Sequence, residues 1–136
     1  MLLVDTNVLI DVLENDQRWA DWSIRQLRVQ AQVHELAINP VIYAELSLAF
    51  TRYERLDAVI AGLGLILHEV PRPALFLAGK AFAQYRKAGG SKTGVLPDFL
   101  IGAHAAVEAW PLLTRDAQRY RAYFPSVELV TPESSP

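Results

Sequence analysis

Three consecutive apolar residues near the N-terminus, Leu2 to Val4, run directly into a carboxylate, a hydroxyl and an amide. A short apolar run that stops abruptly at turn-forming residues is typical of a buried strand in a parallel sheet. Asp5 would then lie at the carboxyl end of that strand, which is the edge of open parallel α/β sheets where ligands bind. A simpler interpretation is that Asp5 only begins the next helix through an Asx turn.

The rest of the chain alternates short apolar runs with helical patterns, so we expect an α/β fold with a parallel sheet. Further strands are predicted at 34–38, 65–67, 112–114 and 127–130. Helices are predicted at 8–14, 18–32, 52–63, 98–108 and 117–123, with one more after the Asn39-Pro40 cap and another that ends near residue 87. A chain of 136 residues fits one domain, which we place at 1–131 with a frayed tail at 132–136.

Composition excludes several classes of protein. There is no cysteine, which rules out disulfides, zinc–thiolate sites and a cysteine nucleophile. No apolar run reaches the roughly 18 residues that a membrane span needs. Met1 leads straight into the first strand, so we expect no signal peptide and a cytoplasmic protein. The net charge of −2 argues against a general nucleic-acid coat but allows a local basic patch.

Two further carboxylates fall on helix positions that point toward the core. Glu45 is expected on the apolar face of its helix, together with Val41 and Leu48. A carboxylate there is unfavourable unless it is paired or metal-bound, although a glutamate at the edge of the face could reach water. Asp98 shares a helix face with Ile101, but the helix dipole alone would also favour an acid in the first turn.

The opening pattern recurs near the C-terminus, where an apolar strand ends at Thr114 and Asp116 follows. Four acids could therefore converge above one edge of the sheet: Asp5, Glu45, Asp98 and Asp116. Without a cation these carboxylates would repel one another and take up protons. A bound Mg²⁺ or Mn²⁺ ion would remove that penalty and could activate a water to hydrolyse a phosphodiester bond. The hydroxyls and amide of Thr6, Asn7 and Thr114 could hydrogen-bond the carboxylates or metal-bound waters.

Charge is unevenly distributed in the second half of the chain. Between Glu69 and Asp98 there is no acid, whereas Arg72, Lys80, Arg86, Lys87 and Lys92 are all basic. Such a run is often a solvated helix face, but this one ends beside Asp98, and we expect it to form a rim that contacts phosphate. The residues expected to contact RNA are Arg86, Lys87, Lys92 and Arg115.

Taken together, these motifs resemble the PIN-domain nucleases, and within them the VapC-type toxins of prokaryotic toxin–antitoxin pairs. The resemblance spans essentially the whole chain and rests on four segments: Leu3-Val4-Asp5-Thr6-Asn7, Asn39-Pro40 with Ala44-Glu45-Leu46, Leu96-Pro97-Asp98-Phe99-Leu100-Ile101-Gly102-Ala103, and Leu112-Leu113-Thr114-Arg115-Asp116.

The resemblance implies a three-layer α/β/α sandwich with a mostly parallel central sheet and Mg²⁺- or Mn²⁺-dependent endoribonuclease activity. It also implies a homodimer, inhibited by a small VapB-like antitoxin whose tail covers the acidic site. The roles of metal ligand and catalytic acid would fall to Asp5, Glu45, Asp98 and Asp116. Some members of the family carry a further acid at the position of Gly102, so whether one or two metal ions bind stays open.

Three other functions compete with this interpretation. A phosphatase of the haloacid dehalogenase type needs a second aspartate where this chain has Asn7. A receiver-like signalling domain needs paired acids at the first strand and a lysine after a late strand, where Arg115 stands. A PIN-like scaffold that binds RNA or a partner without catalysis stays open, and a test of metal-dependent RNA cleavage separates it from the enzyme.

Overall fold

A parallel sheet forms the centre of the molecule in the computed structural model, which describes residues 1–92 and 94–132. Within these residues the sheet has five strands in the order β3-β2-β1-β4-β5, and all neighbouring strands are parallel. The strands are β1 Leu2–Val4, β2 Leu36–Ile38, β3 Leu65–Leu67, β4 Leu112–Leu113 and β5 Leu129–Val130. The predicted strands are confirmed, three of them in shorter form.

The first strand, β1, lies in the middle of the sheet and is completely buried. Its three side chains have 0% exposed surface. Leu3 lies opposite Ala37 of β2 on one side and opposite Leu112 of β4 on the other. Strands that are covered on both faces contain unbroken apolar runs, and this is why the opening residues indicated a buried strand.

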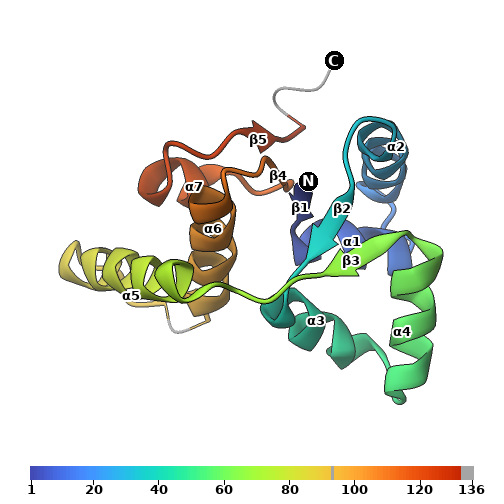
Figure 1. The fold of residues 1–136 in the computed structure, drawn as a ribbon, viewed down its shortest axis with the longest axis horizontal. Helices are drawn as coiled ribbons and strands as arrows, with labels where there is room; N and C mark the ends of the chain where they lie inside the picture. Colours follow the sequence, from blue (N-terminus) through green and yellow to red (C-terminus); the bar gives the residue numbers. More distant parts are fainter. Residues whose placement is uncertain (93, 133–136) are drawn as a thin grey trace.

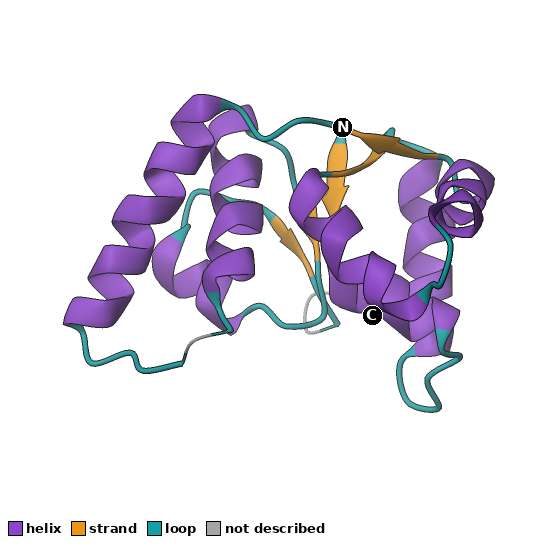
Figure 2. Ribbon diagram, turned by 90° about the horizontal axis from the view of Figure 1, so that it is seen from below, coloured by secondary structure: helices purple, strands orange, loops and turns teal. Residues whose placement is uncertain are grey.

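Helices cover both faces of the sheet, so the predicted α/β/α sandwich is confirmed (Figures 1 and 2). Figure 1 shows α5, α6 and α7 on one side of the sheet and α1, α2 and α4 on the other. The helices are α1 Thr6–Leu13, α2 Ala20–Ala31, α3 Pro40–Leu46, the short 3-10 helix η1 Ser47–Ala49, α4 Tyr53–Gly62, α5 Arg72–Lys87, α6 Leu96–Glu108 and α7 Gln118–Tyr123. Over residues 1–92 and 94–132, none of them has the length and apolar character to cross a membrane.

The order of the strands reverses between β1 and β4. The chain runs from β1 through β2 to β3 at one edge, and α5 and α6 then carry it back to β4 on the other side of β1. Right-handed crossovers place the helices that follow β1 and β4 on opposite faces, which opens a crevice at the carboxyl ends of these two strands. Asp5 comes directly after the last residue of β1, and Asp116 lies three residues after the end of β4.

A buried polar contact joins the start of α3 to α6. Asn39 caps α3 as predicted, because its Oδ1 accepts a hydrogen bond from the backbone N–H of Ile42 at 3.0 Å. Its Nδ2 lies 3.1 Å from Nδ1 of His104, which is completely buried in α6. Since α3 carries Glu45 and α6 carries Asp98, this contact fixes the two helices that hold these acids relative to each other.

The buried face of α3 differs from the prediction. We expected Val41 and Leu48 to be buried beside Glu45, but the buried residues are Ile42 and Leu46, and Leu48 is 90% exposed. The α-helix ends at Leu46 and the chain tightens into η1, which turns Leu48 to solvent. Glu45 nevertheless lies beside the buried face and is itself half-buried. Of the predicted tail, residues 133–136 lie outside the described residues.

Gly102 provides a test of how tightly α6 packs on α7. A Cβ atom at this position would lie 2.4 Å from Cδ2 of Phe124 and 3.0 Å from Cδ1 of Tyr120. Both rings are almost completely buried, so neither can move without disturbing the core. We expect Gly102→Ala to lower the free energy of unfolding by about 1–3 kcal/mol, measured by urea denaturation.

The matched control is Gly79→Ala, on helix α5. A Cβ atom there meets nothing within 4 Å. Alanine should therefore raise the free energy of unfolding by up to about 1 kcal/mol through helix propensity alone. Equal effects of the two substitutions would contradict the close packing at Gly102.

Candidate active site

Asp5 lies in the crevice between β1 and β4 and is only 5% exposed. Its Oδ2 accepts hydrogen bonds from Oγ1 of Thr114 at 2.8 Å and from the hydroxyl of Tyr120 at 2.9 Å. Its backbone N–H donates to the carbonyl of Leu113 at 2.9 Å, which continues the pairing of β1 with β4. Burial raises the pKa of Asp5 to about 6, although the hydrogen bonds from Thr114 and Tyr120 lower it in part.

Glu45 approaches the crevice from α3. Oγ1 of Thr6, the first residue of α1, donates a hydrogen bond to Oε1 of Glu45 at 2.6 Å. Partial burial raises the pKa of Glu45 above its usual value, and the negative charge of Asp98 raises it further. Thr6 at the start of α1 thus holds the glutamate near the end of α3 in place.

Asp98 lies in the first turn of α6 and is paired with an arginine of α7. NH1 of Arg119 lies 2.5 Å from Oδ2 of Asp98, with only 21% of the Arg119 side chain exposed. Burial raises the pKa of Asp98, and the arginine opposes this shift because it stabilises the ionised carboxylate. The guanidinium therefore supplies positive charge within the group of acids.

Asp116 lies at the exposed rim and is tied to the same crevice through its backbone. Its N–H donates to Oγ1 of Thr114 at 3.1 Å. The side-chain amide of Asn7 donates to the same oxygen at 3.3 Å, and the Asn7 carbonyl oxygen accepts from the backbone N–H of Arg115 at 3.3 Å. Thr114 and Asn7 therefore connect the carboxyl ends of β1 and β4.

The four predicted acids act on one another electrostatically. The charge of Asp98 raises the pKa values of both Asp5 and Glu45, and the charge of Asp116 raises the pKa of Asp98. Residues that are far apart in the chain are therefore close enough in the structure to oppose each other's ionisation. This is the arrangement in which a cation stabilises ionised carboxylates.

These donors have the right chemistry for Mg²⁺ or Mn²⁺, because all of them are oxygen atoms. Among residues 1–92 and 94–132, however, no three acids or histidines lie close enough together to hold one ion. Asp98 is turned toward Arg119 instead. A divalent ion would therefore compete with the arginine for this carboxylate.

The basic residues expected to contact RNA occupy different environments. Arg86 and Lys87 are exposed at the end of α5, and Lys92 is exposed in the loop that follows. Arg115 is engaged elsewhere: its Nε and NH2 donate to the two carboxylate oxygens of the buried Asp11 at 2.7 Å and 3.1 Å.

Sequence reasoning missed Arg119 and Tyr120. Tyr120 is 2% exposed, and burial together with the charge of Asp5 raises the pKa of its hydroxyl, which stays protonated and donates. Phe124, four residues later, is also buried, and this spacing was the available signal that Tyr120 faces inward. No local pattern indicated that its hydroxyl would reach Asp5.

Comparison with known proteins agrees with this architecture. The PIN domain family model matches residues 2–125. No curated protein sequence matches the chain.

Several solved structures share the fold over almost their whole length. The VapBC2 structure from Rickettsia felis, bound to a promoter DNA fragment, matches with a TM-score of 0.73 at 20% identity. The alignment covers 96% of this chain and 97% of the VapBC2 chain. FitAcB from Neisseria gonorrhoeae matches with a TM-score of 0.71 at 21% identity, and the alignment covers 99% of this chain and 100% of the FitAcB chain. A toxin–antitoxin complex from Klebsiella pneumoniae matches with a TM-score of 0.62 at 25% identity, and the alignment covers 97% of this chain and 98% of the matched chain.

The pKa of Asp5 leads to a prediction about stability in the absence of metal. Since the pKa is 3.8 for the unperturbed group and about 6 in the folded protein, folding favours the protonated form. Stability should therefore be lost as the pH rises from about 4 to about 6, by up to about 3 kcal/mol. The asparagine side chain of the Asp5→Asn variant cannot ionise. We therefore expect the free energy of unfolding of this variant to be higher than that of the wild type at pH 7.5 but not at pH 4.

The measurement is urea denaturation in EDTA at the two pH values. Glu128→Gln, which removes an exposed carboxylate, controls for the loss of one negative charge. A difference between Asp5→Asn and the wild type that does not change with pH would contradict the raised pKa.

Proposed function

This chain belongs to the PIN domain family, and from that premise we propose that it is a metal-dependent endoribonuclease, the toxin of a type II toxin–antitoxin pair. The observation that supports this proposal most directly is the position of four acids from four separate segments around the carboxyl ends of β1 and β4. The charge of Asp98 raises the pKa values of Asp5 and Glu45, and the charge of Asp116 raises the pKa of Asp98. A divalent cation bound near these acids would stabilise their ionised forms.

The proposed ligands are these same four acids, and the proposed ion is Mg²⁺ or Mn²⁺. When bound, such an ion activates a water and stabilises the attacked phosphate of RNA. The chain's own residues orient the ligands. Thr6 holds Glu45, while Thr114 and Tyr120 hold Asp5 from the other side of the crevice. Asn7 donates a hydrogen bond to Thr114, so these contacts together orient Asp5 and Glu45.

The proposed partners follow from the relatives. The structures that share the fold include toxin–antitoxin complexes, which supports a VapB-like antitoxin as the partner of this chain. We further propose that the protein is a cytoplasmic homodimer and that Arg86, Lys87, Lys92 and Arg115 contact RNA. The single domain is proposed to extend over residues 1–131.

A scaffold without catalysis is the second candidate function. The pairing of Asp98 with Arg119 favours it, because a metal-free site can be stable when a guanidinium neutralises one of its acids. Metal dependence separates the two candidates, since a scaffold needs no divalent ion to bind RNA.

We expect purified protein to cleave total RNA in Mn²⁺ or Mg²⁺ and not in EDTA. Asp5→Asn should lower the rate by about 100-fold or more. Thr114→Val should lower it by about 10- to 100-fold, because the loss of a hydrogen bond to a metal ligand typically reduces metal affinity or activity by that factor. The rates are measured from labelled RNA on gels, and Arg28→Ala on α2 serves as a control that leaves all four acids intact. Equal cleavage in EDTA, or by Asp5→Asn, would overturn the proposed mechanism.

A second measurement tests the metal site without relying on catalysis. Millimolar Mn²⁺ should raise the melting temperature of the wild type, because a ligand that binds only the folded state stabilises it. The shift should disappear in Asp5→Asn. An absence of any shift in the wild type would count against the site.

A further inference from the structure

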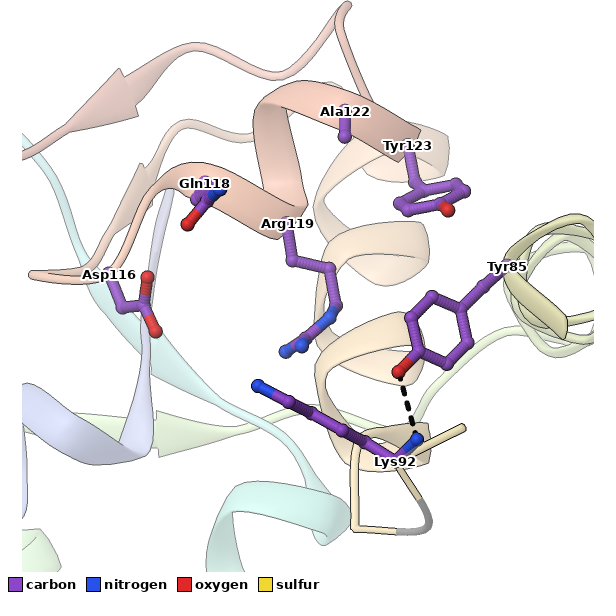
Figure 3. Close-up of a pocket in the computed structure, with 7 residues that line it drawn as sticks. All are labelled: Tyr85, Lys92, Asp116, Gln118, Arg119, Ala122 and Tyr123. Carbon is purple, nitrogen blue, oxygen red and sulfur yellow. Dashed lines mark hydrogen bonds between the residues drawn. The ribbon is translucent and has the colours of Figure 1, made fainter. Parts of the chain in front are cut away.

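A cavity of about 350 Å³ opens beside the proposed metal site. Asp116 lines the side nearest β4, and the opposite wall is formed by Tyr85 of α5 and Tyr123 of α7 (Figure 3). Arg119 and Lys92 also line it. The cavity therefore combines two cations and two aromatic rings next to an acid of the proposed catalytic set. A volume of this size lies at the small end of the range for ligand pockets, about 300–1,000 Å³.

The two cations enter the cavity from different elements. Figure 3 shows the side chain of Arg119 descending from α7 and that of Lys92 reaching across from the loop after α5, so that both charged ends lie on the side of Asp116. The loop is attached to the aromatic wall, because the backbone N–H of Lys92 donates to the hydroxyl of Tyr85 at 3.1 Å. Among residues 1–92 and 94–132, Lys92 forms no ion pair with an acid. Its charge is available to a ligand.

The aromatic wall packs on the core. The ring of Tyr85 lies 5.6 Å from that of Phe99 and 6.1 Å from that of Tyr123, and Phe99 is completely buried. The guanidinium of Arg119 lies over the Tyr85 ring at 5.8 Å. Aromatic rings and cations arranged side by side bind single-stranded nucleic acid, since bases stack on the rings and phosphates pair with the cations.

We propose that this cavity is a subsite for one unpaired nucleotide of RNA, the one that adjoins the scissile phosphate. This inference rests on the proposed ribonuclease function and identifies the form of its substrate. Arg119 and Lys92 bind the phosphate, and the base packs against Tyr85 and Tyr123. The nucleotide must be unpaired, because a base within a duplex presents neither of its faces to a side chain.

Arg119 has a second role in this arrangement. In the structure its guanidinium is paired with Asp98, a proposed metal ligand. The positive charge of the arginine opposes binding of a divalent ion at the same carboxylate. Arg119 contacts Asp98 through Nη1, and its other N–H groups can bind the phosphate of the substrate whether or not the ion is present.

The first test compares two substitutions that each remove one positive charge, in a binding assay without catalysis. Fluorescence anisotropy of a fluorescein-labelled single-stranded RNA is measured in EDTA over a range of salt concentrations. Lys92→Ala should weaken binding and reduce the slope of log affinity against log salt by about 0.7, the value for one contact to a single strand. Arg28→Ala removes one positive charge from the exposed face of α2, outside the cavity, and should leave the slope unchanged.

The second test addresses the aromatic wall. Tyr85→Leu should weaken binding of the single strand by about 5-fold or more, as expected for the loss of a stacking ring. Tyr85→Phe keeps the ring but loses the hydroxyl that contacts the backbone of Lys92, so it should bind more tightly than Tyr85→Leu. A duplex of the same sequence should not distinguish Tyr85→Leu from the wild type. Melting curves confirm that each variant is folded.

The third test uses the opposite effects expected of Arg119→Gln. This substitution should weaken RNA binding in EDTA while lowering the concentration of Mn²⁺ needed for half-saturation, which is followed by the electron paramagnetic resonance signal of free Mn²⁺. A variant that merely disturbed the fold would weaken both.

Several results would overturn the subsite. These are equal salt slopes for Lys92→Ala and Arg28→Ala, unchanged binding by Tyr85→Leu, or displacement of the RNA by pentaglutamate as readily as by unlabelled RNA, which would show that the cavity selects only negative charge. Failure of the proposed nuclease gives a different result: no cleavage with any metal while the differences among these variants in EDTA persist.

Discussion

The arrangement of the site depends on one buried carboxylate. Asp5 lies where the innermost strand ends, with three donors around a single oxygen: the hydroxyls of Thr114 and Tyr120, and more distantly the amide of Asn7 at 3.4 Å. Two of these donors come from the far end of the chain. A charged group in this position is unfavourable without them, and its raised pKa shows that they compensate for burial only in part. The same contacts join β1, β4 and α7, so stability and site geometry share one set of hydrogen bonds.

Charge balance explains why an arginine lies among the acids. The charge of Asp98 raises the pKa values of Asp5 and Glu45, that of Asp116 raises the pKa of Asp98, and Arg119 opposes the shift at Asp98. The guanidinium lies near both Asp98 and the ring of Tyr85, which lines the cavity. A residue in that position can stabilise the protein without metal and still contact a substrate. Arg119 therefore connects the group of acids with the basic, aromatic cavity.

Local sequence was informative wherever a residue's role depends on its near neighbours. The apolar run before Asp5 placed this acid at a strand end, and Asn39-Pro40 marked the start of a helix, because strand burial and helix capping are decided over a few residues. The buried face of α3 could not be predicted from local sequence. The prediction that Val41 and Leu48 share a buried face required one continuous α-helix, whereas the chain changes to a 3-10 helix at Ser47. Arg119 and Tyr120 escaped notice because a short helix with two basic residues resembles an ordinary solvated surface.

The sequence by itself determined the α/β class, the order of the elements and the four acids that are candidate metal ligands, since periodicity and turn chemistry act locally. Only the tertiary structure decided how those acids meet. The reversal of strand order between β1 and β4 brings Asp5 near Asp116, and the contact of Asn39 with His104 sets α3 against α6. It also decided that Arg115 pairs with Asp11 while Arg119 pairs with Asp98. Such choices depend on contacts between residues at least 21 positions apart in the sequence, which no local pattern encodes.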